Sequence, residues 1–116
     1  MPQVTIYHNP RCSKSRQTLK LLEDRGLNPQ IVEYLKQPPD EATLRNVLNK
    51  LGISAGELIR QKEHRALDLP STDDADELIR RMAAHPEIIE RPIVIVGHQA
   101  RLGRPPENVA EILPTP

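Results

Sequence analysis

The sequence predicts an α/β fold built on a small mixed sheet of four strands, and two observations lead to this prediction. Near the N-terminus a strand-like segment, a helical segment and a second strand-like segment follow one another, which is the order of a parallel βαβ unit. Near the C-terminus two more strand-like segments flank the short Gly97-His98 connection, which suits an antiparallel hairpin. Helical patterns occupy the chain between these two pairs.

The first strand is predicted over residues 3–7, where apolar and polar side chains alternate and strand-forming residues dominate. A turn follows, and a helix then begins at Cys12 or Ser13 and ends at Gly26. The second strand is predicted over residues 31–35. This order places Cys12 between a strand and the start of a helix.

Two helices are predicted next. Asp40 is the expected N-cap of a helix that ends at Gly52, and its apolar stripe consists of Leu44, Val47, Leu48 and Leu51. Ser54 and Glu57 have the spacing of a capping box, so we expect a short helix from about 55 to 61.

The following residues, 62–71, are predicted to be irregular. Caps and acidic residues at 71–74 then begin another helix, which Pro86 stops. On this helix Arg80 and Arg81 are both expected on the exposed side.

The last elements are a hairpin and a helix. The β-branched run of residues 93–96 lies between Pro92 and Gly97, which is typical of a strand buried on both faces. Residues 99–102 are its predicted partner strand, and a final helix opens at residues 105–106.

Length and charge limit the function classes. The chain has 116 residues, enough for one domain, and its 16 Lys and Arg balance 16 Asp and Glu. A neutral chain argues against nucleic acid or an anionic membrane as partner, and its only aromatic residues, Tyr7 and Tyr34, offer little base stacking. No apolar stretch approaches the roughly 20 residues that span a bilayer. Without a secretory pattern at the N-terminus, we expect a cytoplasmic protein.

Cys12 is the single cysteine, so it has no disulfide partner within the chain and offers no sulfur cluster for zinc. Amides at a helix N-terminus lower a thiol pKa, as do neighbouring cations, here Arg11, Lys14 and Arg16. This setting favours a reactive thiolate over an inert, buried cysteine. Because Ser15 stands where a resolving cysteine would be, any disulfide of Cys12 must involve an outside thiol.

Other cysteine chemistries have less support. A phosphatase loop needs an arginine six residues after the cysteine, and that position holds Thr18. A cysteine hydrolase needs an oriented histidine, and no spacing selects one. The side chain of His8 either tunes the thiolate or only shapes the turn. The other three histidines are expected at the surface, and no pair has the spacing of a metal site. They are His64, His85 and His98.

Residues 8–16 read His-Asn-Pro-Arg-Cys-Ser-Lys-Ser-Arg, which closely resembles the H-N-P-x-C-x-x-S-R loop of the glutaredoxin-linked arsenate reductase (ArsC-like) family. Further blocks resemble that family in the same order along nearly the whole chain. These blocks are residues 34–39, 52–60, 91–94 and 101–105.

The resemblance implies a single thioredoxin-like domain over residues 1–116, with a helical insertion at about 40–88. It also implies that Cys12 is the nucleophile that attacks arsenate or a similar oxyanion. The peptide bond before Pro92 would be cis. Three arginines would bind the anion, as planar guanidinium groups do through paired hydrogen bonds. These are Arg60, Arg91 and Arg104.

The same resemblance implies the supporting residues and the reductants. His8 would assist formation of the thiolate, and Ser15 and Arg16 would stabilise it. Glutathione would be a co-substrate and glutaredoxin a protein partner, with no bound cofactor and no metal. Two features are typical of a shorter arsenate-reductase-like branch. Ser13-Lys14 stands in place of the Gly-Thr pair of other members, and the chain ends soon after Leu113.

Two other functions remain open at this point. The same thiolate could act on glutathione mixed disulfides of another substrate. A redox-responsive regulator resembling Spx, which binds RNA polymerase, has the same fold, but its usual C-x-x-C pattern is absent because Ser15 replaces the second cysteine.

Overall fold

The computed structural model describes residues 3–114, and their contacts group into two compact units. Residues 3–37 and 91–114 form the first unit, which we call the sheet unit, and Pro38–Glu90 form the second, the helical unit. Within the described residues, no helix is both long enough and apolar enough to cross a membrane. That the chain is one domain stays a prediction.

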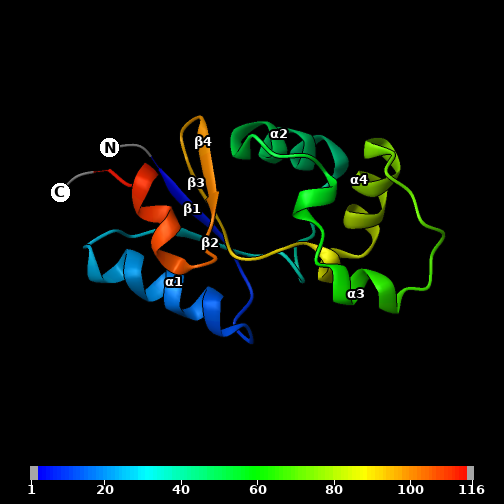
Figure 1. Ribbon diagram of the computed structural model, residues 1–116. Coiled ribbons are helices and arrows are strands. Elements are labelled where there is room, and N and C mark those ends of the chain that lie inside the picture. The colour runs from blue at the N-terminus through cyan, green and yellow to red at the C-terminus, as the bar shows by residue number, and fades with distance from the viewer. Residues whose placement is uncertain (1–2, 115–116) are drawn as a thin grey trace. The chain divides into compact units, whose positions relative to one another are not determined.

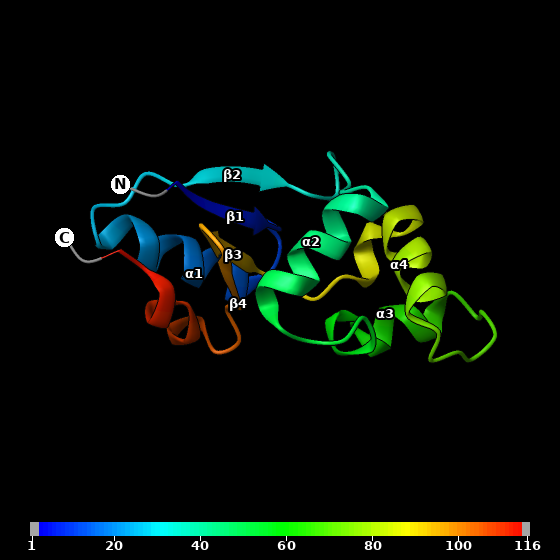
Figure 2. The same ribbon diagram turned by 90° about the horizontal axis from the view of Figure 1, so that it is seen from above.

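The sheet unit contains a mixed sheet with the strand order β2-β1-β3-β4 (Figures 1 and 2). β1 runs parallel to β2 and antiparallel to β3, and β3 pairs antiparallel with β4. The strands are β1 (Val4–His8), β2 (Gln30–Glu33), β3 (Ile93–Val96) and β4 (Gln99–Leu102). The parallel pair and the hairpin are as predicted, although β2 ends at Glu33, two residues before the expected end.

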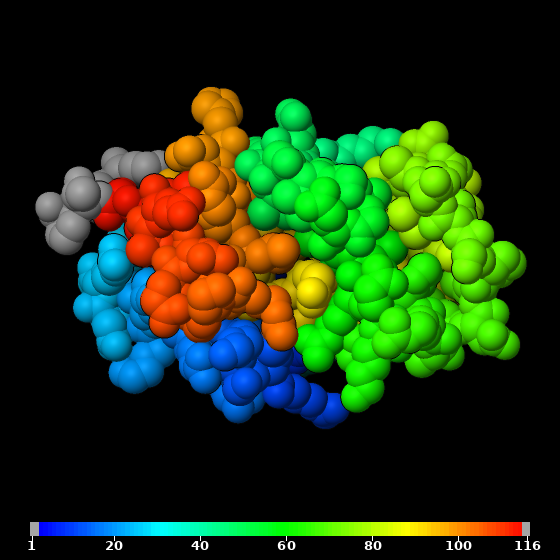
Figure 3. All heavy atoms as spheres, viewed as in Figure 1, coloured from blue at the N-terminus to red at the C-terminus, as the bar shows by residue number. Residues whose placement is uncertain are grey.

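Two helices pack against the sheet unit's core, α1 (Ser13–Asp24) and the 3₁₀ helix η3 (Pro106–Ile112). Their atoms lie directly against each other in Figure 3. The core between them and the sheet is aliphatic, consisting of Val4, Ile6, Leu22, Val94, Val96, Val109 and Ile112. The expected C-terminal helix is thus present, with 3₁₀ geometry.

The strand alternation of β1 positions one polar side chain at this core. Val4, Ile6 and His8 are the buried residues of β1, and because side chains alternate along a strand they share one face. Along α1, Ser15 and Leu22 are both buried. His8, at the end of β1, therefore lies on the face that carries α1.

The helical unit consists of five helical segments, and most of their ends match the predictions. They are α2 (Glu41–Leu51), η1 (Gly56–Leu58), α3 (Gln61–Ala66), α4 (Ala75–Ala84) and η2 (Pro86–Ile88). The Asp40 carboxylate accepts the backbone N–H of Thr43 at 2.8 Å and so caps α2. At the other end, Gly52 adopts the left-handed conformation. Ser54 and Glu57 form the predicted capping box.

Two predictions for the helical unit were wrong. The short helix expected at 55–61 is only the 3₁₀ turn η1, because the backbone beyond it pairs elsewhere: Ile59 bridges to Ile89, and the N–H of Arg60 donates to the carbonyl of Ile88 at 2.7 Å. The supposedly irregular region contains α3, which buries none of its residues and so has no apolar stripe to signal it.

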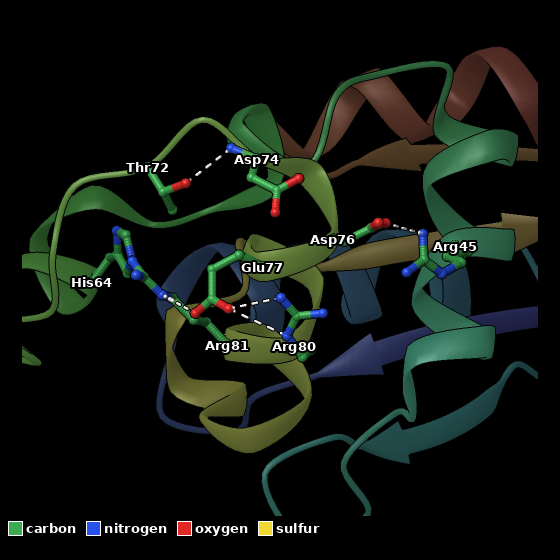
Figure 4. A network of polar contacts seen from close by, with 8 residues as sticks. All are labelled: Arg45, His64, Thr72, Asp74, Asp76, Glu77, Arg80 and Arg81. Atoms are coloured by element: carbon green, nitrogen blue, oxygen red, sulfur yellow. Dashed lines mark hydrogen bonds and ion pairs between the residues drawn. The ribbon is translucent and has the colours of Figure 1, made fainter.

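Arg81 was also wrongly predicted, since only 7% of it is exposed, whereas Arg80 is exposed as expected. Figure 4 shows the reason: Nε of Arg81 donates to Glu77 at 2.9 Å, and Nη1 lies 3.1 Å from Nε2 of His64. Because the guanidinium has partners, its charge is tolerated at low exposure. Of the other histidines, His98 is exposed as predicted, whereas His64 and His85 are half-buried.

Gly52→Ala is expected to lower the free energy of unfolding by about 1 kcal/mol, because a Cβ is disfavoured at φ 69°. No atom lies within 4 Å of the added Cβ, so the cost is conformational and not a clash. Gly56→Ala is the matched control, since its Cβ would make ordinary contact with Leu78 at 3.9 Å. Urea denaturation of the two variants measures the difference, and equal stabilities would contradict this account.

Candidate active site

The buried hydroxyl of Ser15 joins the end of β1 to the first turn of α1. Oγ of Ser15 shares a hydrogen bond of 2.7 Å with Nδ1 of His8 and accepts the backbone N–H of Asn9 at 3.0 Å. All three residues are buried. The structure therefore brings together His8 and Ser15, two of the residues predicted for the site.

The loop between β1 and α1 is held by its own hydrogen bonds. Oδ1 of Asn9 accepts the N–H of Arg11 at 3.0 Å, and the carbonyl of Asn9 accepts the N–H of Cys12 at 3.0 Å. The guanidinium of Arg16 donates to the carbonyl of Pro10 at 2.9 Å. Arg16 thus binds the loop backbone, which fixes the shape of the loop that carries the cysteine.

Cys12 is the N-cap residue of α1, is partly buried, and is a free thiol. Partial burial acts to raise the thiol pKa, but the backbone amides of Ser15 and Lys14 and the charges of Arg91 and Arg104 act to lower it. The net result is a pKa below the usual value of a cysteine. The direction of this shift is the one that the sequence predicted, and the role of Cys12 as a nucleophile stays a prediction.

Arg91 and Arg104 lie on neighbouring segments that continue the β3–β4 hairpin. The N–H of Gly103 donates to the carbonyl of Pro92 at 2.9 Å, and Nη1 of Arg104 donates to the carbonyl of Arg91 at 3.2 Å. Arg91 is buried, whereas Arg104 is exposed. The Arg91-Pro92 peptide is cis as expected, and so is the peptide between Arg104 and Pro105.

Sequence reasoning missed two residues that shape this region. Asn9 makes three of the loop's hydrogen bonds, and only the turn-forming Asn-Pro pair hints at this. Gly103 packs so closely that a Cβ would lie 2.8 Å from Cγ of Pro92 and closer still to Oγ1 of Thr18. Nothing in the local sequence indicates that contact, because it joins segments far apart in the chain.

The environment of His8 favours the neutral form of its imidazole over the charged form. Burial lowers the pKa of His8 from its ordinary value; Glu33 acts to raise this pKa, and Arg16 acts to lower it further. A neutral imidazole cannot stabilise the thiolate as a cation. The hydrogen bond between Nδ1 of His8 and Oγ of Ser15 links the imidazole to the first turn of α1.

Arg60 belongs to the helical unit, where it is the N-cap residue of α3. Its Nε donates to Glu63 at 2.8 Å, and its side chain is 30% exposed. The role of Arg60 in binding an anion stays a prediction. Among residues 3–114 there is no group of three or more His, Cys, Asp or Glu side chains that could hold a metal ion.

Comparison with known proteins connects this site to a family. The sequence profile of the ArsC family matches residues 7–112. The chain is 53% identical to the "Uncharacterized protein YfgD" of Escherichia coli (strain K12), over 96% of this chain and 97% of that protein. It is 47% identical to the "Arsenate reductase" of Neisseria meningitidis serogroup A, over 97% and 100% of the two chains.

A solved structure of a similar protein has a similar fold. The "Arsenate reductase from Vibrio cholerae" superposes with a TM-score of 0.87 at 44% identity, covering 97% of this chain and 98% of the other. This likeness confirms the thioredoxin-like fold class and the helical segment between the second and third strands.

The thiol pKa of Cys12 is expected to rise in Arg104→Ala, because a nearby positive charge that favours the thiolate is removed. Thiolate absorbance near 240 nm, followed during a pH titration, measures this. Arg101→Ala is the matched control, since Arg101 is on β4 and its Nε pairs with Glu111 at 3.1 Å. A pKa raised equally in both variants would contradict the assignment.

Proposed function

Because the chain belongs to the ArsC family, we propose that it is an arsenate reductase, an oxidoreductase in which Cys12 is the nucleophile. The observation that supports this most is the setting of Cys12. The lowered pKa of its thiol favours the thiolate, and two cations that act to lower it, Arg91 and Arg104, also suit a tetrahedral oxyanion. Relatives named arsenate reductase along nearly the whole chain support the choice of anion.

In the first step, the thiolate of Cys12 attacks the arsenic atom. A sulfur–arsenic bond forms, and one arsenate oxygen leaves as water after taking up protons. Arsenic remains pentavalent in this adduct. Arg91 and Arg104 offset the negative charge of the oxyanion, which would otherwise repel an anionic nucleophile.

In the second step, the thiolate of glutathione attacks the sulfur of Cys12. A disulfide forms between the two sulfurs, the sulfur–arsenic bond breaks, and its electron pair reduces arsenic to the trivalent state. A glutaredoxin thiol then attacks the glutathione sulfur and releases Cys12.

The outside thiols are obligatory because the sequence has a single cysteine. We place this reaction in the cytoplasm, where thiols are kept reduced.

The remaining site residues prepare the nucleophile and hold the substrate. Ser15 fixes the first turn of α1, whose amides favour the thiolate, and neutral His8 orients the Ser15 hydroxyl. Arg16 stabilises the thiolate by holding the loop closed. Arg60 is the third anion ligand in this proposal.

Cys12→Ser is expected to abolish arsenate reduction, because no second thiol can replace Cys12. Oxidation of NADPH in the presence of arsenate, glutathione, glutaredoxin and glutathione reductase measures turnover. Wild-type turnover without any added thiol would contradict the scheme. If the wild type reduces a glutathione mixed disulfide but not arsenate, the disulfide oxidoreductase function replaces this proposal.

Arg60→Ala is expected to lower kcat/KM for arsenate about 10- to 100-fold, the effect of losing a charge-assisted hydrogen bond worth about 1.5–3 kcal/mol. Arg45→Ala is the matched control, because Arg45 lies in the same unit and pairs with Asp76 at 2.9 Å. The same coupled assay measures both variants. Equal losses would show that Arg60 does not bind the substrate.

A further inference from the structure

A cavity of about 280 Å³ opens beside the cysteine loop and lies entirely within the sheet unit. Residues 8–11, which lead directly to Cys12, form one wall. The other wall consists of Glu33, at the end of β2, together with Leu35 and Lys36. It therefore lies where the parallel strands β1 and β2 end, a common place for ligands in sheets with parallel strands.

Both walls of the cavity are fixed by backbone hydrogen bonds. The Asn9 side chain and carbonyl hold the first wall, as described above for the loop. In the second wall, the N–H groups of Lys36 and Gln37 both donate to the carbonyl of Glu33 at 2.9 Å. A cavity with fixed walls loses little conformational entropy when it binds a ligand.

The walls carry charges of both signs. Arg11 and Lys36 are cationic and exposed, and Glu33 supplies a carboxylate. Nζ of Lys36 lies 3.8 Å from Oε1 of Glu33, which is a weak, solvated pairing that a ligand can replace. Leu35 is 42% exposed, one of the few large apolar side chains with such exposure. A ligand that fits carries a carboxylate, an ammonium group and a short aliphatic stretch.

An oxyanion alone fits this cavity less well, since Glu33 would repel it. A free amino-acid group, in contrast, places its carboxylate against Arg11 and Lys36 and its ammonium against Glu33. The volume is slightly below the usual range of about 300–1,000 Å³ for small-molecule sites, so it suits one end of a peptide-sized molecule.

We propose that this cavity binds the amino-acid end of the small zwitterionic thiol that attacks Cys12. This inference rests on the proposed function, which requires an outside thiol because the chain has one cysteine. Cys12 does not line the cavity but directly follows Arg11, which does, with Cα atoms about 3.8 Å apart, so a thiol whose amino-acid end binds in the cavity has its sulfur end free to reach towards Cys12. Holding the thiol there raises its effective concentration.

Binding can be measured without turnover. S-methylglutathione has the zwitterionic end of glutathione but no reactive thiol, and it is titrated into ¹⁵N-labelled protein. The expected result is a saturable shift of the backbone amides of Arg11, Leu35 and Lys36. In Lys36→Glu the dissociation constant should rise about tenfold, as expected when an attractive charge becomes a repulsive one.

Lys20→Glu is the matched control, because Lys20 is an equally exposed lysine that pairs with Asp24 on α1, outside the cavity. It should bind the analogue as the wild type does. If the amides beside the cavity do not shift, or if both variants bind with equal affinity, the proposal is overturned. The same holds if glutaredoxin shifts these amides while S-methylglutathione does not, since the cavity would then belong to a protein-docking surface.

Turnover separates this inference from the proposed function. In Lys36→Glu the KM for glutathione should rise relative to the KM for uncharged 2-mercaptoethanol, whereas Lys20→Glu should leave that ratio unchanged. If the wild type reduces arsenate with both thiols and the ratio is the same in both variants, the cavity proposal fails and the reductase stands. If S-methylglutathione binds in the cavity but neither thiol supports arsenate reduction, the reductase fails and the thiol subsite stands.

Discussion

The arrangement of this site depends on one buried hydroxyl. Oγ of Ser15 binds Nδ1 of His8 and the N–H of Asn9, so a single atom fixes a strand end, a loop and the first turn of a helix relative to one another. The amides that favour the thiolate belong to that same turn. Because Ser15 is fully buried, its hydrogen bonds meet no competition from water, and losing one would leave a polar group unsatisfied. The position that carries a second cysteine in a dithiol enzyme here has a structural task instead.

The setting of Cys12 is a balance of opposing effects. Partial burial disfavours its charged form, while two backbone amides and two arginines favour it. The amides are part of the helix and cannot move away, so they act whether or not a substrate is bound. The charges of Arg91 and Arg104 are different, because a bound oxyanion would offset them. In the proposed reaction, the thiolate is therefore stabilised most strongly before the anion arrives, and its nucleophilicity is greater once the anion is in place.

Sequence reasoning found those features whose causes are local. The caps at Asp40 and Gly52 and the position of Cys12 before α1 follow from a few neighbouring residues, and the structure contains all three. Sequence reasoning failed where contacts between distant parts of the chain, or the lack of buried residues, determine the local structure. α3 buries no residue, so no apolar period marks it. Arg81 is buried with its guanidinium bound not only to Glu77 on the same helix but also to His64, 17 positions earlier in the chain. In the site, motif resemblance supplied the roles of residues that spacing alone left open.

Two arginines near the hairpin, Arg101 and Arg104, differ in what they pair with, and that difference determines which of them keeps its charge for the cysteine. Arg101 and Arg104 are three residues apart in the same hairpin region. The first donates to the carboxylate of Glu111, which neutralises it, whereas the second donates to the carbonyl of Arg91, which leaves its charge in place. Arg104 also acts on Cys12, and Arg101 is not among the groups that shift that thiol's pKa. A chain with zero formal charge thus keeps a cationic site, because carboxylates neutralise its arginines selectively. In the proposed function, an oxyanion is attracted by that local field and not by the protein's net charge.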